Sequence, residues 1–89
     1  MYLNLRTVVE QPQFRKELRR LKRSQKRADE FTLGLQFVLA RNPECGMKIG
    51  DTDVWAIAMN EFVPGDPTVV FYTFNDQNVF LLSIKMFPV

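Results

Sequence analysis

The residues best equipped for chemistry in this sequence are basic, and they lie close together in its first third. Eight lysine and arginine residues fall between Phe14 and Ala28, with Glu17 as the one acid among them. Guanidinium and ammonium groups at this density attract polyanions, so the run indicates a nucleic-acid partner or an acidic protein segment. Besides Lys16, the run contains the predicted nucleic-acid-binding residues Arg15, Arg19, Arg20, Lys22, Arg23, Lys26 and Arg27.

Charge is divided unequally between the two halves of the chain. Residues 1–44 hold ten Lys/Arg against five Asp/Glu, and residues 45–89 hold two against five, giving net charges of +5 and −3. A charge run on a helix is commonly only a solvated face, and this alternative stays open. Segregation of the bases from the acids favours a binding surface instead.

Candidates for catalysis are few. The sequence has no histidine, which removes the commonest general base and the commonest zinc ligand. Cleavage of RNA through its own 2′-hydroxyl needs a base, cations and an acid, and the candidates are Lys48 and Lys85, followed by Tyr72 and Glu61. Tyr72 is more typical of a core, and Cys45 has no histidine to activate it. The glycines and potential ligands form no recognisable motif, so we expect no metal and no cofactor.

The elements that must position these residues form a single predicted domain over residues 1–89. A period of two predicts strands at residues 2–9, 53–59, 68–74 and 79–86. Two helices are expected between the first two strands, separated near Ser24, which can cap the second helix, and ended by Asn42-Pro43. The predicted fold class is therefore α+β, in the order β-α-α-β-β-β, with a helical hairpin packed on an antiparallel sheet.

Apolar spacing predicts which helix faces are buried. The first helix starts near Pro12 and presents Phe14, Leu18 and Leu21 at i, i+4 and i+7. The bases fall into two neighbouring rows on the rest of its surface, where like charges repel. The second helix is expected to bury Ala28, Phe31, Leu35 and Val38.

The sequence leaves open which face of the predicted sheet is buried. Strict alternation predicts a core face, yet the opposite face is apolar as well. Either one strand is out of register, or the C-terminal residues fold over the second face, or a partner covers it. The predicted core face contains Trp55, Ile57, Met59, Val70, Tyr72, Phe74, Phe80, Leu82, Ile84 and Met86. The opposite face contains Val54, Ala56, Ala58, Val69, Phe71, Thr73, Val79, Leu81, Ser83 and Lys85.

Five segments in sequence carry a resemblance to a known family. They are residues 14–22 (FRKELRRLK), residues 39–46 (LARNPECG), Trp55, residues 69–72 (VVFY) and residues 79–84 (VFLLSI). In this order they resemble toxins of the RelE/ParE superfamily, the toxin half of bacterial type II toxin–antitoxin pairs. The resemblance implies the β-α-α-β-β-β fold, a cytoplasmic location and neutralisation by a cognate antitoxin protein. It covers nearly the whole chain.

The family's nuclease branch cuts mRNA in the ribosome, and its other branch acts on DNA gyrase. In the nuclease branch an arginine usually precedes the tyrosine of the third strand by three residues, and Val69 stands there in this sequence. Further cations are usual in the second strand, where this chain has Ala56 and Ala58. Among the family's functional positions only Lys48 and Lys85 carry over.

Two function hypotheses follow. The first is a toxin that inhibits growth by ribosome-dependent mRNA cleavage. The alternative is a non-nucleolytic ParE-like toxin that binds DNA gyrase, or a catalytically degenerate member of the family. Enzymatic activity is thus undecided by the sequence. The single cysteine, the absence of a signal pattern and the absence of a long apolar run predict a cytoplasmic protein without a membrane segment.

Overall fold

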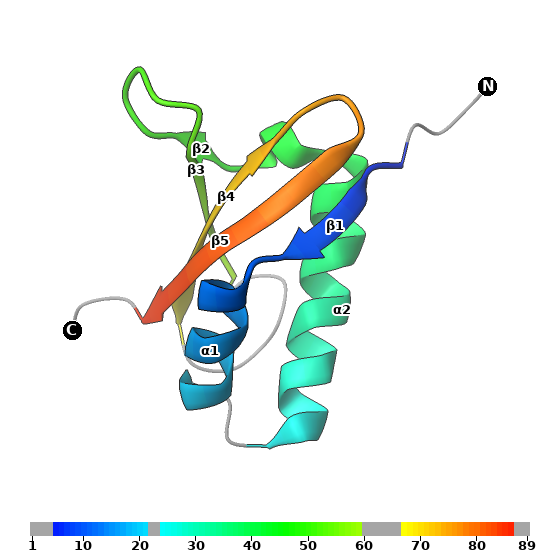
Figure 1. The fold of residues 1–89 in the computed structure, drawn as a ribbon, viewed down its shortest axis with the longest axis vertical. Helices are drawn as coiled ribbons and strands as arrows, with labels where there is room; N and C mark the ends of the chain where they lie inside the picture. The colour runs from blue at the N-terminus through cyan, green and yellow to red at the C-terminus, as the bar shows by residue number, and fades with distance from the viewer. Residues whose placement is uncertain (1–4, 22–23, 60–66, 87–89) are drawn as a thin grey trace.

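The computed structural model describes residues 5–21, 24–59 and 67–86 of the chain (Figure 1). These residues form an α+β fold with a five-stranded sheet and two α-helices, so the α+β part of the predicted fold class is confirmed. The elements are β1 (Thr7–Glu10), α1 (Pro12–Leu21), α2 (Gln25–Arg41), the 3-10 helix η1 (Pro43–Cys45), β2 (Met47–Lys48), β3 (Trp55–Ala58), β4 (Thr68–Phe74) and β5 (Asn78–Met86).

The sheet is mixed, and the expectation of an antiparallel sheet is wrong at one edge. Its strand order is β1-β5-β4-β3-β2, and β1 pairs in parallel with β5 while the remaining neighbours are antiparallel. A parallel pair needs a long connection, and the segment from α1 to β4 provides it. The two-residue strand β2 was not predicted. It pairs with β3 at the other edge of the sheet.

A bulge in β5 explains why both predicted faces of this strand contain apolar residues. Phe71 pairs with Ser83 and Tyr72 pairs with Leu81, which leaves Leu82 as an extra residue in β5. An extra residue in a strand reverses which side chains point to which face of the sheet from that position on. The predicted core face of β3 and β4 is confirmed, but the prediction for β5 is wrong except at one position. The buried residues of β5 are Val79, Leu81 and Ile84, while Phe80 and Leu82 are half-buried and Met86 is exposed.

Local signals set the helix bounds. Pro12 is the first residue of α1, where its missing N–H costs nothing. The Oγ of Ser24 accepts a hydrogen bond from the N–H of Arg27, so the predicted N-cap of α2 is confirmed. α2 ends at Arg41 before Asn42-Pro43. Its buried residues are Ala28, Phe31, Leu35 and Leu39, whereas Val38 is half-buried.

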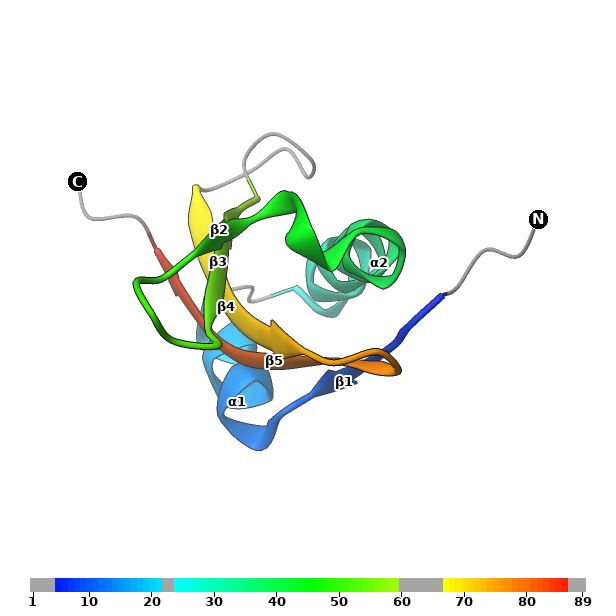
Figure 2. The same cartoon turned by 90° about the horizontal axis from the view of Figure 1, so that it is seen from above.

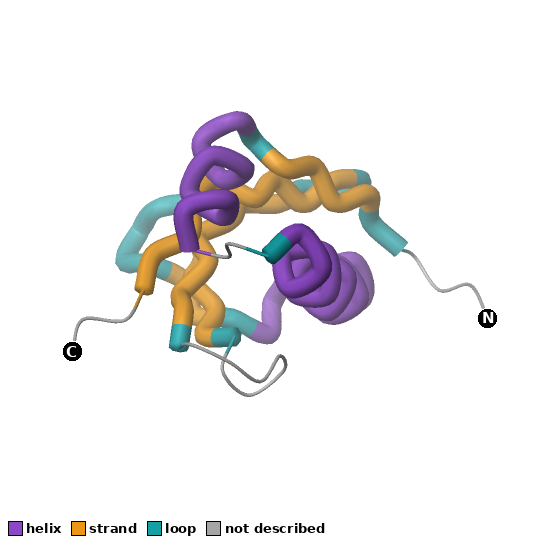
Figure 3. Tube along the Cα trace, turned by 90° about the horizontal axis from the view of Figure 1, so that it is seen from below, coloured by secondary structure: helices purple, strands orange, loops and turns teal. Residues whose placement is uncertain are grey.

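The two helices pack against different parts of the sheet, so the helical hairpin does not form a single layer on one face. β1 ends at Glu10, and beyond that point α1 runs along the edge of β5 that β1 no longer covers (Figures 1 and 2). α2 packs at the other side of the core. Figure 3 shows the two helices standing apart, and the buried side chains Phe14, Leu18 and Phe31 belong to one hydrophobic cluster with the sheet.

The end of α2 is joined to the sheet at Tyr72. Its hydroxyl is buried and donates a hydrogen bond of 2.6 Å to the carbonyl oxygen of Pro43. Gly46 passes so close that a Cβ there would lie 2.5 Å from the Tyr72 hydroxyl and 2.6 Å from the carbonyl oxygen of Ala56. A side chain at Gly46 would therefore push β3 and η1 apart.

Candidate partner-binding surface

All the exposed charged residues of α1 are basic. We define the basic surface as the four exposed cations of this helix, Arg15, Lys16, Arg19 and Arg20. They line a shallow hollow of about 420 Å³ together with Glu10 and Pro12. Arg19 and Arg20 lie in the last turn, where the partial negative charge of the helix end stabilises cations. This geometry suits an anionic surface or segment.

Glu17 interrupts the basic run in the sequence, but it is absent from the exposed face. Its side chain is only 11% exposed and lies against β5. One oxygen, Oε1, accepts hydrogen bonds from the Ser83 hydroxyl at 2.8 Å and from the Ile84 N–H at 3.3 Å. The other oxygen forms an ion pair with the ammonium group of Lys85. We call these four residues the Glu17 clamp.

The Glu17 clamp satisfies a strand edge. The N–H of Ile84 points away from β4, at a position that β1 does not reach, and the carboxylate takes the place of a neighbouring strand. Burial opposes the charged form of Glu17, but the hydrogen bonds from Lys85, Ser83 and Ile84 outweigh it. The pKa of Glu17 therefore lies below its ordinary value.

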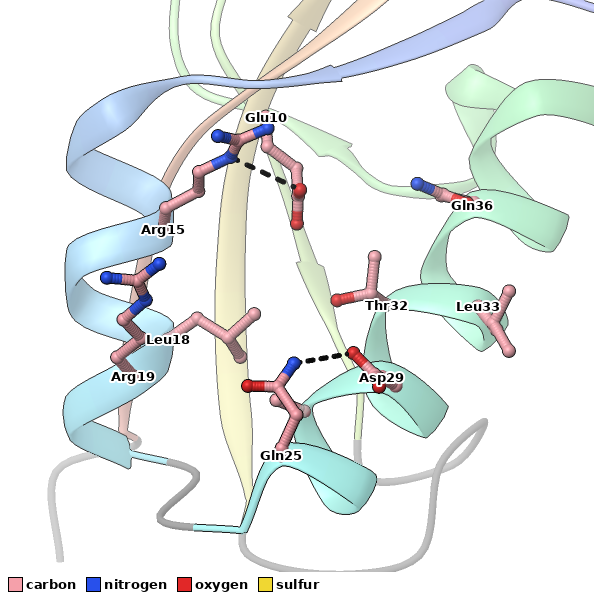
Figure 4. Close-up of a pocket in the computed structure, with 10 residues that line it drawn as sticks. Glu10, Arg15, Leu18, Arg19, Gln25, Asp29, Thr32, Leu33 and Gln36 are labelled. Atoms are coloured by element: carbon pink, nitrogen blue, oxygen red, sulfur yellow. Dashed lines mark hydrogen bonds and ion pairs between the residues drawn. The ribbon is translucent and has the colours of Figure 1, made fainter.

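A groove of about 530 Å³ separates α1 from α2 (Figure 4). Its α1 wall carries Arg15 and Arg19, and Leu18 and Ala28 contribute apolar surface. Arg15 is held by an ion pair of 3.5 Å to Glu10. The α2 wall is polar, with a hydrogen bond of 2.9 Å from Gln25 to Asp29, and also contains Thr32, Leu33 and Gln36.

The remaining cations of the predicted binding set are divided from α1 by the helix break. Lys26 and Arg27 are exposed in the first turn of α2, so the two continuous rows expected from spacing do not extend across Ser24. Lys22 and Arg23 lie outside the described residues.

Lys48 and Lys85 are not brought together. Lys48 pairs with Trp55, whose row continues through Tyr72 to Leu81, whereas Lys85 pairs with Val69. Three strand spacings and about three residues along the strands separate the two backbones by roughly 17 Å. Because the two rows also face opposite sides of the sheet, the lysines cannot act on one substrate atom.

The other catalytic candidates are also poorly placed. Burial raises the pKa of Tyr72, and its proton is engaged by the carbonyl of Pro43, which is the geometry of a structural tyrosine. Desolvation raises the pKa of the Cys45 thiol, although the residue as a whole is exposed, so little thiolate forms at neutral pH. Glu61 lies outside the described residues.

The sequence reasoning missed the Glu17 clamp, yet a signal for part of it was present. Glu17 follows Phe14 by three residues and precedes Leu21 by four, so helical spacing places it on the apolar stripe. A carboxylate on a buried stripe needs a partner, and its partners on β5 are more than sixty residues away.

Among the described residues there is no group of three or more side chains suited to a metal ion, and no described helix is long and apolar enough to cross a membrane. No protein-family model, no curated protein and no solved structure matches the chain.

Proposed function

We propose that this protein is the toxin of a type II toxin–antitoxin pair of the RelE/ParE kind, and that it inhibits growth by docking on a polyanionic target. The observation that carries the proposal is the composition of the basic surface. Every charged residue on the exposed face of α1 is a cation, because Glu17 is buried against β5. Such a face is weakly self-repelling and is stabilised when an anion covers it.

The arrangement of the strands and helices supports the family assignment. The order of β1, α1 and α2 followed by the antiparallel strands β3, β4 and β5 is the order that the sequence resemblance implies. By the same resemblance, a cognate antitoxin would neutralise the protein. Its acidic segment would be expected to cover the basic surface.

The placement of the lysines favours the non-nucleolytic alternative. Cleavage of RNA requires a base, an acid and stabilising cations within reach of one phosphate. Lys85 is held by Glu17, and Lys48 is remote from it. The Tyr72 hydroxyl donates a hydrogen bond to the Pro43 carbonyl oxygen inside the fold. DNA gyrase is then the first target to test.

Ribosome-dependent mRNA cleavage is the second candidate function, because the basic surface also suits RNA. The basic surface would bind the phosphates of ribosomal RNA as readily as it would bind an acidic protein. The ribosome would then supply the catalytic groups that this chain lacks. The cytoplasm is the proposed location in either case.

Controlled expression in bacteria separates these functions. We expect growth arrest with the wild-type chain, arrest unchanged by the double substitution Lys48→Ala and Lys85→Ala, and relief by Arg15→Gln, Arg19→Gln and Arg20→Gln together. Primer extension on cellular mRNA is expected to show no new cleavage sites. A DNA supercoiling assay with purified gyrase then tests the first target.

The contrary results are equally definite. Growth unaffected by wild-type expression would remove the toxin function. New mRNA cleavage sites that disappear with Lys48→Ala would establish the nuclease instead. A charge control is Asp51→Asn with Asp53→Asn, which changes exposed charges between β2 and β3 and leaves the basic surface intact.

A further inference from the structure

The outward face of α2 begins at Leu33, on the border of the groove, and carries a surface that the proposed function does not use. Leu33 and Phe37 are 66% and 61% exposed, although both are large apolar side chains. Their spacing of four residues places them together on one side of the helix, opposite the buried Phe31 and Leu35. An exposed apolar pair near the centre of a helix of 17 residues is a candidate contact site for a partner.

Opposite charges flank this apolar pair along the helix. Glu30 precedes Leu33 by three residues, and Arg41 follows Phe37 by four. Because eleven residues make about three helical turns, Glu30 and Arg41 lie in one row, on the same side of the apolar pair. Neither side chain forms an ion pair within the part of the chain that the structure describes.

Arg41 is already held in position. Its guanidinium carbon lies 3.8 Å from the centre of the Phe37 ring, and Nη1 donates a hydrogen bond of 3.1 Å to the Phe37 carbonyl oxygen. The planar group therefore covers part of the aromatic ring and keeps its outer N–H donors available. A side chain ordered in this way loses little further entropy on binding.

We propose that α2 pairs with α2 of a second copy of this chain in an antiparallel, two-fold symmetric contact. Centring the pair on Leu35 places Leu33 of each copy opposite Phe37 of the other. The same register places Glu30 within about one residue, roughly 1.5 Å along the axis, of Arg41 in the second copy. A two-fold axis across the pair keeps Glu30 and the opposite Arg41 on the same side, so two equivalent ion pairs form.

This self-complementarity is the argument for a second copy as the occupant. An acidic partner would match Arg41 but not Glu30, and RNA would meet Glu30 with repulsion. The antiparallel copy matches both charges and the apolar pair at once. The basic surface of α1 is not needed for the contact, so a dimer would present two such surfaces.

The first experiment is sedimentation velocity on the purified full chain over the micromolar concentration range. We expect reversible dimers for the wild type and monomers for Leu33→Gln with Phe37→Gln. Since both side chains are exposed, this variant should keep the wild-type circular dichroism spectrum. Wild-type protein that stays monomeric throughout, or a dimer unaffected by the double substitution, would overturn the proposal.

A charge exchange tests the register. Glu30→Arg alone and Arg41→Glu alone should each weaken self-association by about tenfold, because each places like charges opposite one another. An equimolar mixture of the two variants should associate as a heterodimer with near wild-type affinity, since opposite charges then meet at both ends. Failure of the mixture to associate more strongly than either variant alone would exclude this pairing.

Discussion

The two faces of α1 use charge in opposite ways. On the face turned to β5, Glu17 holds Lys85 and accepts hydrogen bonds from Ser83 and Ile84, so the charges there are satisfied within the fold. On the exposed face, Arg15 has one partner, Glu10, and three further cations have no ion-pair partner among the described residues. One face therefore contributes to stability, and the other is available to a partner.

This difference decides which cations can be assigned to function. From the sequence alone Lys85 is a catalytic candidate, because the RelE/ParE resemblance carries a functional position over to it. The structure assigns it to the Glu17 clamp, where its role is to neutralise a mostly buried acid. The cations of the basic surface have no such role, so their substitution should change binding without changing the fold.

The largest expected effect is on the buried face. Glu17→Ala removes the acceptor for the Ile84 N–H and leaves a strand edge unsatisfied, so we expect the free energy of unfolding to fall by about 3 kcal/mol. Urea denaturation followed by circular dichroism measures this change. Glu44→Ala is the matched control on an exposed acid, and we expect a change within about 0.5 kcal/mol. Equal effects of the two substitutions would contradict the comparison.

A smaller change in the free energy of unfolding is expected at acidic pH. Because the pKa of Glu17 is lower in the folded than in the unfolded state, the unfolded chain binds more protons below its ordinary value of 4.5. The contribution of Glu17 to stability is therefore complete above that pH and is lost as the pH falls through the lower folded value. Glu17→Gln should flatten this part of the stability profile. Thermal unfolding at a series of pH values tests it, and an unchanged slope would count against the clamp.

Removing Lys85 from the Glu17 clamp should lower the free energy of unfolding less than removing Glu17. Lys85→Met leaves Glu17 its bonds from Ser83 and Ile84, and the Lys85 side chain is 59% exposed, so solvent screens the ion pair. We expect a loss of about 0.5 kcal/mol in the free energy of unfolding. Lys48→Met, on an exposed lysine outside the clamp, is the control. A loss as large as that of Glu17→Ala would mean that the ion pair dominates the clamp.

The smallest effect on stability is expected from the basic surface. Arg15→Gln, Arg19→Gln and Arg20→Gln together should change the free energy of unfolding by no more than about 0.5 kcal/mol. The same variant should bind single-stranded RNA with a log–log salt dependence shallower by about 2, for three lost phosphate contacts. Fluorescence anisotropy at several salt concentrations measures this slope. A wild-type slope in the variant would show that these cations do not meet phosphate.

Much of the fold was predictable because its signals are local. Pro12 at a first helical turn, the Ser24 cap and Asn42-Pro43 each act through the residues beside them, and the helix bounds follow. The exposed cations were predictable for the same reason, since spacing alone separates them from Phe14 and Leu18. The clamp was not, because its two halves are joined only by folding.

The bulge at Leu82 shows where periodicity fails. No glycine or proline marks it within β5, and one extra residue transfers Val79 and Leu81 to the core face. The half-buried Phe71 and Phe80 still lie on the opposite face, so a smaller apolar surface persists there.

By itself, the sequence determined the α+β class, the ends of the helices and the concentration of positive charge on α1, because these depend on contacts between near neighbours. Only the tertiary structure decided that β1 joins β5 in parallel, that β5 changes face at Leu82 and that Glu17 captures Lys85. Each of those depends on residues far apart in the chain. These residues pair because buried strand edges and buried charges need hydrogen-bond or ion-pair partners, and the fold brings such partners together.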